Sequence, residues 1–315
     1  MDSSQQPART RPVTITDIAA RTGVAPSTQA RALTSGRTGT IALLVSDVTN
    51  PFYFGIIRGT QQGLKAAGYA QLLIDTENSG DLEIDMLHKM RQSLDGAILA
   101  ASRLADRALA GLAAEIPLVT INRNVKGVPS VVIDTPAGIS QAAEHLISLG
   151  HRDIAYVAGP ANSWPNATRW QAMRGVATRL GLEFARVGPF PRGLPSGAPA
   201  ADAVLNTRAT ACVVFNDLIA IGMLTRLRDR GVRVPDDMSV VGCDDIFGAD
   251  FCNPPLTTLT APIEHAGRVA VSMLLSRLDA RLPPPARRSV LLPTHLTIRE
   301  STGPAPAGPR RRRPS

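Results

Sequence analysis

The sequence has few cysteines and no long apolar run. Only Cys212, Cys243 and Cys252 occur among its 315 residues, and no two of them form a CxxC pair. An odd number of cysteines without such a pair is typical of a reducing compartment and argues against a disulfide framework. No apolar run approaches the roughly 20 residues that span a bilayer, and residues 1–13 contain no apolar signal-peptide core. We therefore expect a cytoplasmic protein without a membrane partner.

Common catalytic and metal-binding motifs are also missing. The chain has no GxSxG, HExxH or GxxxxGK[ST] segment. Asp244 and Asp245 are adjacent carboxylates with no evident acid or base partner, and His145, His151 and His265 lack the spacing of metal ligands. We predict no catalytic residue, no metal site and no cofactor, and we expect a binding protein in preference to an enzyme.

Positive charge is concentrated at the two ends of the chain. The formal net charge is +8, of which residues 1–40 contribute +3 and Arg310–Arg313 contribute +4, so the residues between are nearly neutral. Basic ends suit an anionic polymer such as DNA, because arginines that neutralise phosphates release counterions. The alternative for the C-terminal run is a solvated basic tail.

From residue 40 onward, short β-branched runs alternate with segments of helical periodicity. TIALLVSDV is followed by PFYFGIIRGTQQGLKAAG, and the pattern continues through AQLLIDTE, GAILAA and PLVTIN. A second series of the same kind begins at SVVID and includes DIAYVAG, ATACVVFN and MSVVGCDD. This alternation predicts an α/β fold with two doubly wound parallel sheets. Glycines stand where left-handed helix C-caps are expected, at Gly68, Gly150, Gly181 and Gly231.

Three segments rich in proline or glycine interrupt this pattern. The segment Gly188–Ala200 is predicted to be a surface loop, and Leu282–Arg288 a connection into a last strand. The composition of the residues after Arg299 predicts disorder.

Polar residues follow many of the predicted strands. Ligands of open parallel sheets bind beyond the carboxyl ends of the strands, so two facing sheets would form a cleft lined by amides and carboxylates. Such a cleft suits a hydroxyl-rich or otherwise polar small molecule. The alternative for each residue is a helix N-cap or a turn. The residues concerned are Asp47–Phe52, Asp75, Asn122, Asp134, Asn216–Asp217 and Asp244–Asp245.

Several strings, taken together and in order, resemble the lactose-repressor (LacI/GalR) family of bacterial transcription regulators. They are VTITDIAARTGVAPST, RTGTIALLVSDVTNPFY, EHLISLGHRDIAYVAGP, VVFNDLIAIG, VPDDMSVVGCDDI, NPPLTTL and LPTHLTIREST. The resemblance implies a periplasmic-binding-protein-like type I core of two subdomains, a small N-terminal helix-turn-helix and a homodimer.

The resemblance also implies a division of the chain. It places a headpiece and hinge at residues 1–38, an effector-binding core at 39–303 and a disordered basic tail at 304–315. The core would contain subdomain one at 39–134 and 261–285, and subdomain two at 135–260 and 286–303.

Effector contacts of the family can be carried onto matching positions of this chain. The resemblance implies that Arg169 is the effector clamp, although Met173 replaces the usual aromatic residue four positions later. A guanidinium, a carboxylate and an amide in one cleft would form charge-assisted hydrogen bonds to a sugar, a sugar acid or a nucleobase. The alternatives are a helix-surface arginine at 169 and a loop cap at Asp244. Asn122 stands where an aspartate is common. The full set is Phe52, Tyr53, Asn122, Arg169, Asn216 and Asp244.

The N-terminal segment predicts a helix-turn-helix. Its first helix would cover Thr16–Thr22, Gly23 would make the turn, and the second helix would begin near Pro26 or Ser27. The second helix of this motif lies in the major groove of DNA. Residues at the start of that helix suit bases and the arginines suit phosphates, while the resemblance assigns Leu33 to the minor groove. The predicted DNA contacts are Thr16, Arg21, Ser27, Thr28, Gln29, Arg31 and Leu33.

This headpiece is shorter than the family pattern. The segment Ser27–Leu33 matches both the recognition helix and the hinge helix of the family, which indicates an internal loss of the third helix between them. So short a segment has too few apolar side chains to close a core, and one short helix cannot occupy both grooves. We therefore expect specific DNA affinity to be weak or lost, with residual salt-sensitive binding.

Two functional hypotheses follow from these observations. The first is an effector-responsive, DNA-binding transcriptional regulator of the repressor type that senses a small polar ligand such as a sugar or sugar acid. The alternative is a ligand-binding core that has lost specific DNA binding through loss of the third headpiece helix.

Overall fold

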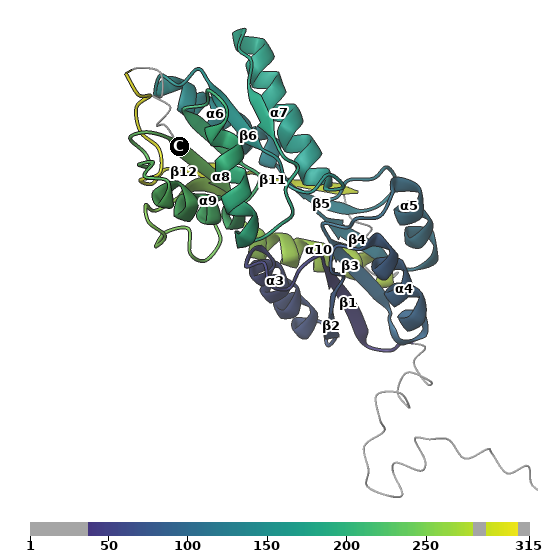
Figure 1. The fold of residues 1–315 in the computed structure, drawn as a ribbon. Helices are drawn as coiled ribbons and strands as arrows, with labels where there is room; N and C mark the ends of the chain where they lie inside the picture. The colour runs from purple at the N-terminus through teal and green to yellow at the C-terminus, as the bar shows by residue number, and fades with distance from the viewer. Residues whose placement is uncertain (1–36, 280–287, 308–315) are drawn as a thin grey trace, which may run out of the picture.

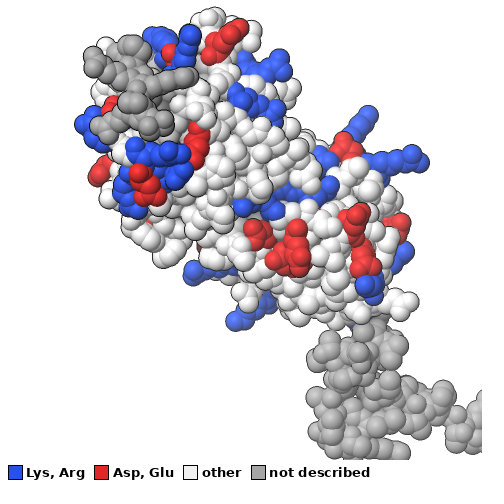
Figure 2. Space-filling view, in the orientation of Figure 1, with Lys and Arg blue, Asp and Glu red and all other residues white. Residues whose placement is uncertain are grey.

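The computed structural model describes residues 37–279 and 288–307, which form two α/β subdomains side by side (Figure 1). No helix in these two ranges is both long and apolar enough to cross a bilayer. Lysine and arginine side chains are interspersed with aspartate and glutamate over the face of both subdomains that Figure 2 shows.

The first subdomain contains a six-stranded, fully parallel sheet with the strand order β11-β5-β4-β3-β1-β2. Its central strands are buried on both faces, which is why they read as continuous apolar runs in the sequence. The strands are β1 (Thr40–Val45), β2 (Ala70–Asp75), β3 (Gly96–Ala100), β4 (Leu118–Ile121), β5 (Ser130–Ile133) and β11 (Ser289–Leu292).

Helices cover both faces of this first sheet (Figure 1). Alternate residues of β1 face opposite sides, so Leu43 packs with α3 and α10 while Leu44 packs with α4 and α5. The helical elements are α3 (Phe52–Ala66) and α10 (Ile263–Leu278) on one face, and α4 (Gly80–Met90), the 3-10 helix η1 (Arg91–Ser93) and α5 (Asp106–Glu115) on the other.

The second subdomain repeats this design with the strand order β12-β10-β9-β8-β6-β7. All of its pairs are parallel except that between β10 and β12, which is antiparallel. The strands are β6 (Ile154–Val157), β7 (Ala185–Val187), β8 (Ala211–Val214), β9 (Ser239–Cys243), β10 (Thr257–Thr260) and β12 (His295–Thr297).

Helices again lie on both faces of the second sheet. Val213 of β8 packs with α6 and α7, whereas its neighbour Cys212 packs with α8 and α9. The helical elements are α6 (Thr135–Ser148), α7 (Trp164–Leu180), the 3-10 helix η2 (Leu194–Ser196), α8 (Gly197–Leu205) and α9 (Asp217–Asp229). The predicted α/β class with two doubly wound sheets is therefore confirmed.

The chain passes between the subdomains three times, after β5, after β10 and after β11. The last crossing corrects a predicted boundary, because residues 286–303 were expected to lie wholly in subdomain two. Strand β11 instead pairs with β5 at the edge of the first sheet, and its Leu292 is buried in the core of that subdomain. The crossing therefore falls between Leu292 and His295, where β12 begins, and not at the proline-rich segment before β11.

The predicted surface loop Gly188–Ala200 is wrong in its second half. This stretch contains η2 and the first turn of α8, which packs closely against α9. The contact requires glycine, because a Cβ on Gly197 would lie 2.2 Å from the carbonyl carbon of Gly222. A glycine in this segment therefore allows α8 and α9 to pack closely, in addition to the glycines and prolines that form the preceding turn.

The predicted disorder after Arg299 is also wrong for residues 300–307. Ser301 is fully buried, and its hydroxyl donates to the carbonyl oxygen of Val240 at 2.6 Å. The Gly303 carbonyl lies 3.0 Å from the imidazole Nε2 of His151, and the Ala305 amide donates to the Leu149 carbonyl at 2.8 Å. These hydrogen bonds fix the segment although its composition is typical of disorder; residues 308–315 lie outside the described range.

Candidate ligand-binding site

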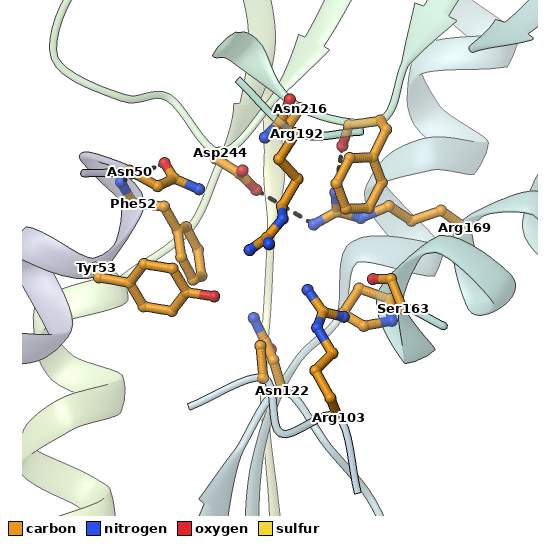
Figure 3. Close-up of a pocket in the computed structure, with 13 residues that line it drawn as sticks. Asn50, Phe52, Tyr53, Arg103, Asn122, Ser163, Arg169, Arg192, Asn216 and Asp244 are labelled. Carbon is orange, nitrogen blue, oxygen red and sulfur yellow. Dashed lines mark hydrogen bonds and ion pairs between the residues drawn. The ribbon is translucent and has the colours of Figure 1, made fainter. Parts of the chain in front are cut away.

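A cavity lies between the two subdomains, at the carboxyl ends of the parallel strands (Figure 3). Its walls follow β1, β3 and β4 of the first sheet and β6, β7, β8 and β9 of the second. This is the position at which open parallel sheets bind ligands. The lining residues are Asn50, Phe52, Tyr53, Ala101, Arg103, Asn122, Ser163, Pro165, Arg169, Arg192, Phe215, Asn216 and Asp244.

The structure brings all six sequence-predicted effector residues into this one cavity. The first turn of α3 carries two of them, the loop after β4 one, α7 one, and the loops after β8 and β9 one each. Their contact with a ligand stays a prediction. The six are Phe52, Tyr53, Asn122, Arg169, Asn216 and Asp244.

The first turn of α3 forms an aromatic wall. The rings of Phe52 and Tyr53 meet edge to face, with centroids 5.2 Å apart, and both side chains are buried. The amide of Phe52 donates to Asn50 Oδ1 at 3.0 Å, which fixes the chain where the helix begins. Burial raises the pKa of Tyr53, so its hydroxyl stays protonated as it points into the cavity (Figure 3).

Arg169 is held in place by a network of protein groups. Its Nη2 donates to Asp244 Oδ1 at 3.2 Å, its Nε to Thr135 Oγ1 at 3.3 Å, and its Nη1 to the Phe215 carbonyl. The guanidinium also lies 5.0 Å from the centroid of the Phe215 ring. The side chain is only 3% exposed, which excludes the helix-surface alternative for this residue. Arg169 is a buried, ion-paired group at the cavity wall.

Asp244 is strained as well as buried. Burial raises the pKa of its carboxyl group, while the neighbouring Arg169 acts to lower it. Its backbone φ is 119°, and two other lining residues, Ala101 and Asn122, have φ of 56° and 55°. Left-handed φ at residues other than glycine costs about 1–3 kcal/mol each and concentrates at functional sites. Three such residues around one cavity support a functional role for it.

A second carboxylate, that of Asp217, lies behind this wall and does not line the cavity. It is fully buried and accepts from Thr258 Oγ1 at 2.6 Å and from the Ile246 amide at 3.0 Å. Burial, and then the nearby charge of Asp244, raise the pKa of Asp217 to about 7. A proton on Asp217 would relieve repulsion between the two carboxylates.

The two asparagine amides are oriented by the backbone. Asn122 Oδ1 accepts from the Ile133 amide at 3.0 Å, and Asn216 Oδ1 accepts from the Ile219 amide at 3.1 Å as the N-cap of α9. Each oxygen already accepts one hydrogen bond from the backbone, so the Nδ2 groups are the freer atoms for a ligand. Figure 3 shows the amide nitrogen of Asn122 facing the cavity. Both residues therefore offer hydrogen-bond donors.

Other strand-end acids are turn or cap residues, as the alternative proposed. Asp134 Oδ1 accepts from the Ala137 amide as the N-cap of α6. Asp47 and Asp75 accept from backbone amides two residues further on, at 3.0 Å in each case. None of these three acids lines the cavity.

Sequence reasoning missed the arginines of the site. Arg103 lies three residues after the end of β3, so its position beyond a strand end is a signal that could have found it. Arg192 lies between β7 and η2, in the predicted surface loop, where no periodicity indicates direction. Figure 3 shows both side chains pointing into the cavity.

The predicted DNA-contacting residues all lie outside the described residues, as does the proposed fusion of two helices at Ser27–Leu33. Those predictions concern Thr16, Arg21, Ser27, Thr28, Gln29, Arg31 and Leu33.

Comparisons with known proteins agree with this architecture. The sequence profile of the periplasmic binding protein-like domain matches residues 143–302. The transcriptional regulator DegA of Bacillus subtilis is 32% identical over 289 residues, covering 89% of this chain and 85% of DegA. The ribose operon repressor of Escherichia coli is 30% identical over 275 residues, covering 81% and 80% of the two chains. A solved complex of the transcriptional regulator CelR with cellobiose is 30% identical with a TM-score of 0.75, covering 90% of this chain and 88% of CelR.

The fold is a core of two subdomains with a polar cleft at the strand ends, and it places this protein in the class of ligand-binding proteins. With the relatives above, it shows that the chain belongs to the LacI/GalR family of transcription regulators. The resemblance drawn from the sequence is therefore confirmed.

Proposed function

We propose that this protein is an effector-responsive transcriptional repressor whose cleft binds a hydroxyl-rich small molecule such as a sugar or sugar acid. The observation that carries the proposal is the convergence of the six effector residues, from both subdomains, on one cavity. Relatives that are a ribose operon repressor and a cellobiose-bound regulator support this ligand class. The protein would act in the cytoplasm as a homodimer on a DNA operator, with residues 1–38 as its DNA-binding headpiece.

The cleft geometry suggests how a ligand would control the protein. Arg169, Asn216 and Asp244 belong to the second subdomain, whereas Phe52, Tyr53 and Asn122 belong to the first. A ligand that contacts both groups favours one relative orientation of the subdomains, and it shifts the population by its difference in affinity for the two states. In a dimer that shift would reorient the two headpieces and change operator affinity.

The same geometry favours binding without turnover. Asp244 is engaged by Arg169, and burial keeps Tyr53 protonated, so neither is poised as a general base. The homologues are transcription regulators.

A thermal-shift screen of sugars and sugar acids tests the ligand class. Arg169→Lys keeps a positive charge beside Asp244 but loses the planar, multiple donors of the guanidinium. We expect at least tenfold weaker ligand binding in this variant. Arg174→Gln, at an exposed position on the same helix, is the matched control and should bind like the parent. Parent-like affinity in Arg169→Lys would refute the clamp assignment.

Operator binding needs a separate test, because the headpiece residues lie outside the described range. The names of the relatives favour a DNA-binding regulator over the alternative of a core that has lost specific binding. A gel-shift series on the promoter of the protein's own operon, at physiological salt, separates the two. Sequence-selective nanomolar binding supports the repressor, whereas weak binding that disappears with added salt supports the alternative.

A further inference from the structure

Two arginines of the cleft have buried nitrogens without a hydrogen-bond partner. The Nε and Nη1 atoms of both Arg103 and Arg192 make no hydrogen bond within the described part of the chain. An unsatisfied buried donor costs about 1–3 kcal/mol, and more when it is charged. Arg169, in the same cavity, uses its Nε, Nη1 and Nη2 in hydrogen bonds to protein groups. The donors of Arg103 and Arg192 are therefore available to a ligand.

The surroundings of Arg103 leave its charge largely unpaired. Its Nη2 donates to Asn78 Oδ1 at 3.3 Å, a neutral acceptor. The charge of Glu83 acts to raise the pKa of Arg103, but the Glu83 oxygens accept from the Arg103 backbone amide at 2.8 Å and from Ser102 Oγ at 2.5 Å and not from its guanidinium. No ion pair of Arg103 occurs among the described residues, and burial lowers its pKa.

Arg192 faces Arg103 from the other subdomain. Figure 3 shows their guanidinium groups entering the cavity from opposite sides. Burial, followed by the charge of Arg103, lowers the pKa of Arg192, whereas Tyr53, Asp47 and Asp75 act to raise it. Two positive charges thus point at one space, and no carboxylate of the described chain forms an ion pair with either.

The neighbouring groups on this side are also donors. Asn122 presents its Nδ2, since its Oδ1 accepts from Ile133, and the protonated Tyr53 hydroxyl points the same way (Figure 3). Two guanidiniums, an amide N–H and a phenol O–H make a site that suits an oxyanion, with its negative charge and several acceptor lone pairs, better than a neutral hydroxyl. Arginine binds carboxylate and phosphate with parallel, charge-assisted hydrogen bonds.

We propose that the ligand of this cleft carries an anionic group, a carboxylate or phosphate, held between Arg103 of the first subdomain and Arg192 of the second. This inference rests on the proposed function and names the chemistry of its ligand. The sugar-like part of the ligand would occupy the side of Arg169, Asn216 and Asp244.

The placement of the two arginines makes the anion a link between subdomains. Without it the guanidiniums repel each other, which disfavours a closed cleft. With it, one anionic group accepts hydrogen bonds from both subdomains and replaces that repulsion by attraction. Cleft closure would therefore depend on the anionic group more than on the hydroxyl groups of the ligand.

Matched ligand sets test this proposal on the full chain by calorimetry and thermal shift. The sets are glucose, gluconate and glucose 6-phosphate, and ribose, ribonate and ribose 5-phosphate, with inorganic phosphate against chloride at equal ionic strength as a separate probe. We expect an acidic sugar to bind at least tenfold more tightly than its neutral parent. Arg103→Gln and Arg192→Gln should each remove at least tenfold of the acidic ligand's affinity and change that of the neutral sugar less than threefold. Arg174→Gln is the control for both and should change neither.

The result that would overturn the anion site is equal affinity for acidic and neutral sugars, or acidic-sugar affinity that survives both glutamine variants. Failure of inorganic phosphate and every acidic sugar to stabilise the parent would overturn it too. If neutral sugars bind and Arg169→Lys removes that binding, the proposed function stands although the anion site fails. If no member of either set binds, the sugar-type ligand class fails as well.

The pH dependence distinguishes the two kinds of anion. A phosphate monoester loses its second charge below about pH 6, so its affinity should fall several-fold between pH 7.5 and pH 5.5. A sugar carboxylate keeps its charge over that range and should bind with little change. Either pattern, with the losses in Arg103→Gln and Arg192→Gln, supports the proposal.

Discussion

The arginines on the two sides of the cleft differ in whether protein groups satisfy their hydrogen-bond donors. On one side, Arg169 is 3% exposed and forms an ion pair with Asp244, together with hydrogen bonds to Thr135 and Phe215. On the other side, Arg103 and Arg192 each keep two buried nitrogens without a partner in the described chain. The donors of Arg169 are thus hydrogen-bonded to protein groups, whereas several donors of Arg103 and Arg192 are not.

This difference distinguishes an arginine that stabilises the fold from arginines that bind the ligand. A buried charge is tolerated when it is paired and hydrogen-bonded, and the Arg169 network meets that condition without a ligand. Such a group shapes the wall and presents its remaining donors in fixed directions. Arg103 and Arg192 meet the condition only when a molecule arrives, so they should contribute selectivity in binding and little to the stability of the free protein.

The largest expected effect comes from breaking the paired side. Asp244→Ala leaves Arg169 buried without its carboxylate, and loss of one partner of a buried pair costs about 3–5 kcal/mol. Denaturant unfolding of the ligand-free protein should show this decrease, while the exposed Arg174→Gln should stay within about 0.5 kcal/mol of the parent. A loss below about 1 kcal/mol for Asp244→Ala would show that the pair is not structural.

The residues of the paired side could be predicted from the sequence. Strand patterns place Asn216 and Asp244 directly after parallel strands, and resemblance to a family adds Arg169 on its helix. The alternation of apolar runs predicted the two sheets for the same reason, because burial on both faces imposes a pattern on the sequence.

The unpaired side was not predictable in the same way. Whether a guanidinium has a partner depends on groups distant in the sequence, such as Glu83 beside Arg103, whose carboxylate is taken by Ser102. Arg192 lies in an irregular segment, where no helical or strand periodicity indicates which way its side chain points. For the same reason, the anchoring of residues 301–305 by His151 and Leu149 could not be inferred from a composition that is typical of disorder.

The second prediction concerns the proton behind the paired side. The pKa of Asp217 is raised to about 7 in the folded protein, against about 3.9 in an unfolded chain. Between these values the folded state holds the extra proton, so this group's contribution to stability is full below about pH 4 and is lost as the pH rises towards 7. The slope is at most about 1.4 kcal/mol per pH unit.

Asp217→Asn mimics the protonated acid, since its oxygen can accept from Ile246 and its nitrogen can donate to Thr258. Unfolding curves at several pH values should show the variant gaining on the parent as the pH rises from 5 to 8. Parallel pH profiles for the two proteins would contradict a raised pKa at Asp217.

The third prediction concerns a substitution that gives Arg103 and Arg192 a carboxylate partner. Asn122→Asp retains an oxygen that can accept from Ile133 and adds a negative charge facing Arg103 and Arg192. We expect anionic-ligand affinity to fall about tenfold or more, equivalent to about 1.4 kcal/mol, because the new carboxylate competes for the same donors. Calorimetry with an acidic sugar and its neutral parent measures this, and an equal loss for both ligands would indicate a general distortion of the cleft.

The smallest expected effect lies in the ligand-free protein. Arg192→Gln removes one of two like charges that face each other across the cleft, so the variant should be equally stable or more stable, by less than about 1 kcal/mol, since the side chain is only partly buried and solvent screens the repulsion. Added salt should reduce the difference, because it screens the repulsion in the parent. Denaturant unfolding at low and high salt measures both effects. A clear loss of stability in Arg192→Gln would show that this arginine has a structural partner, and the contrast between the two sides of the cleft would then be lost.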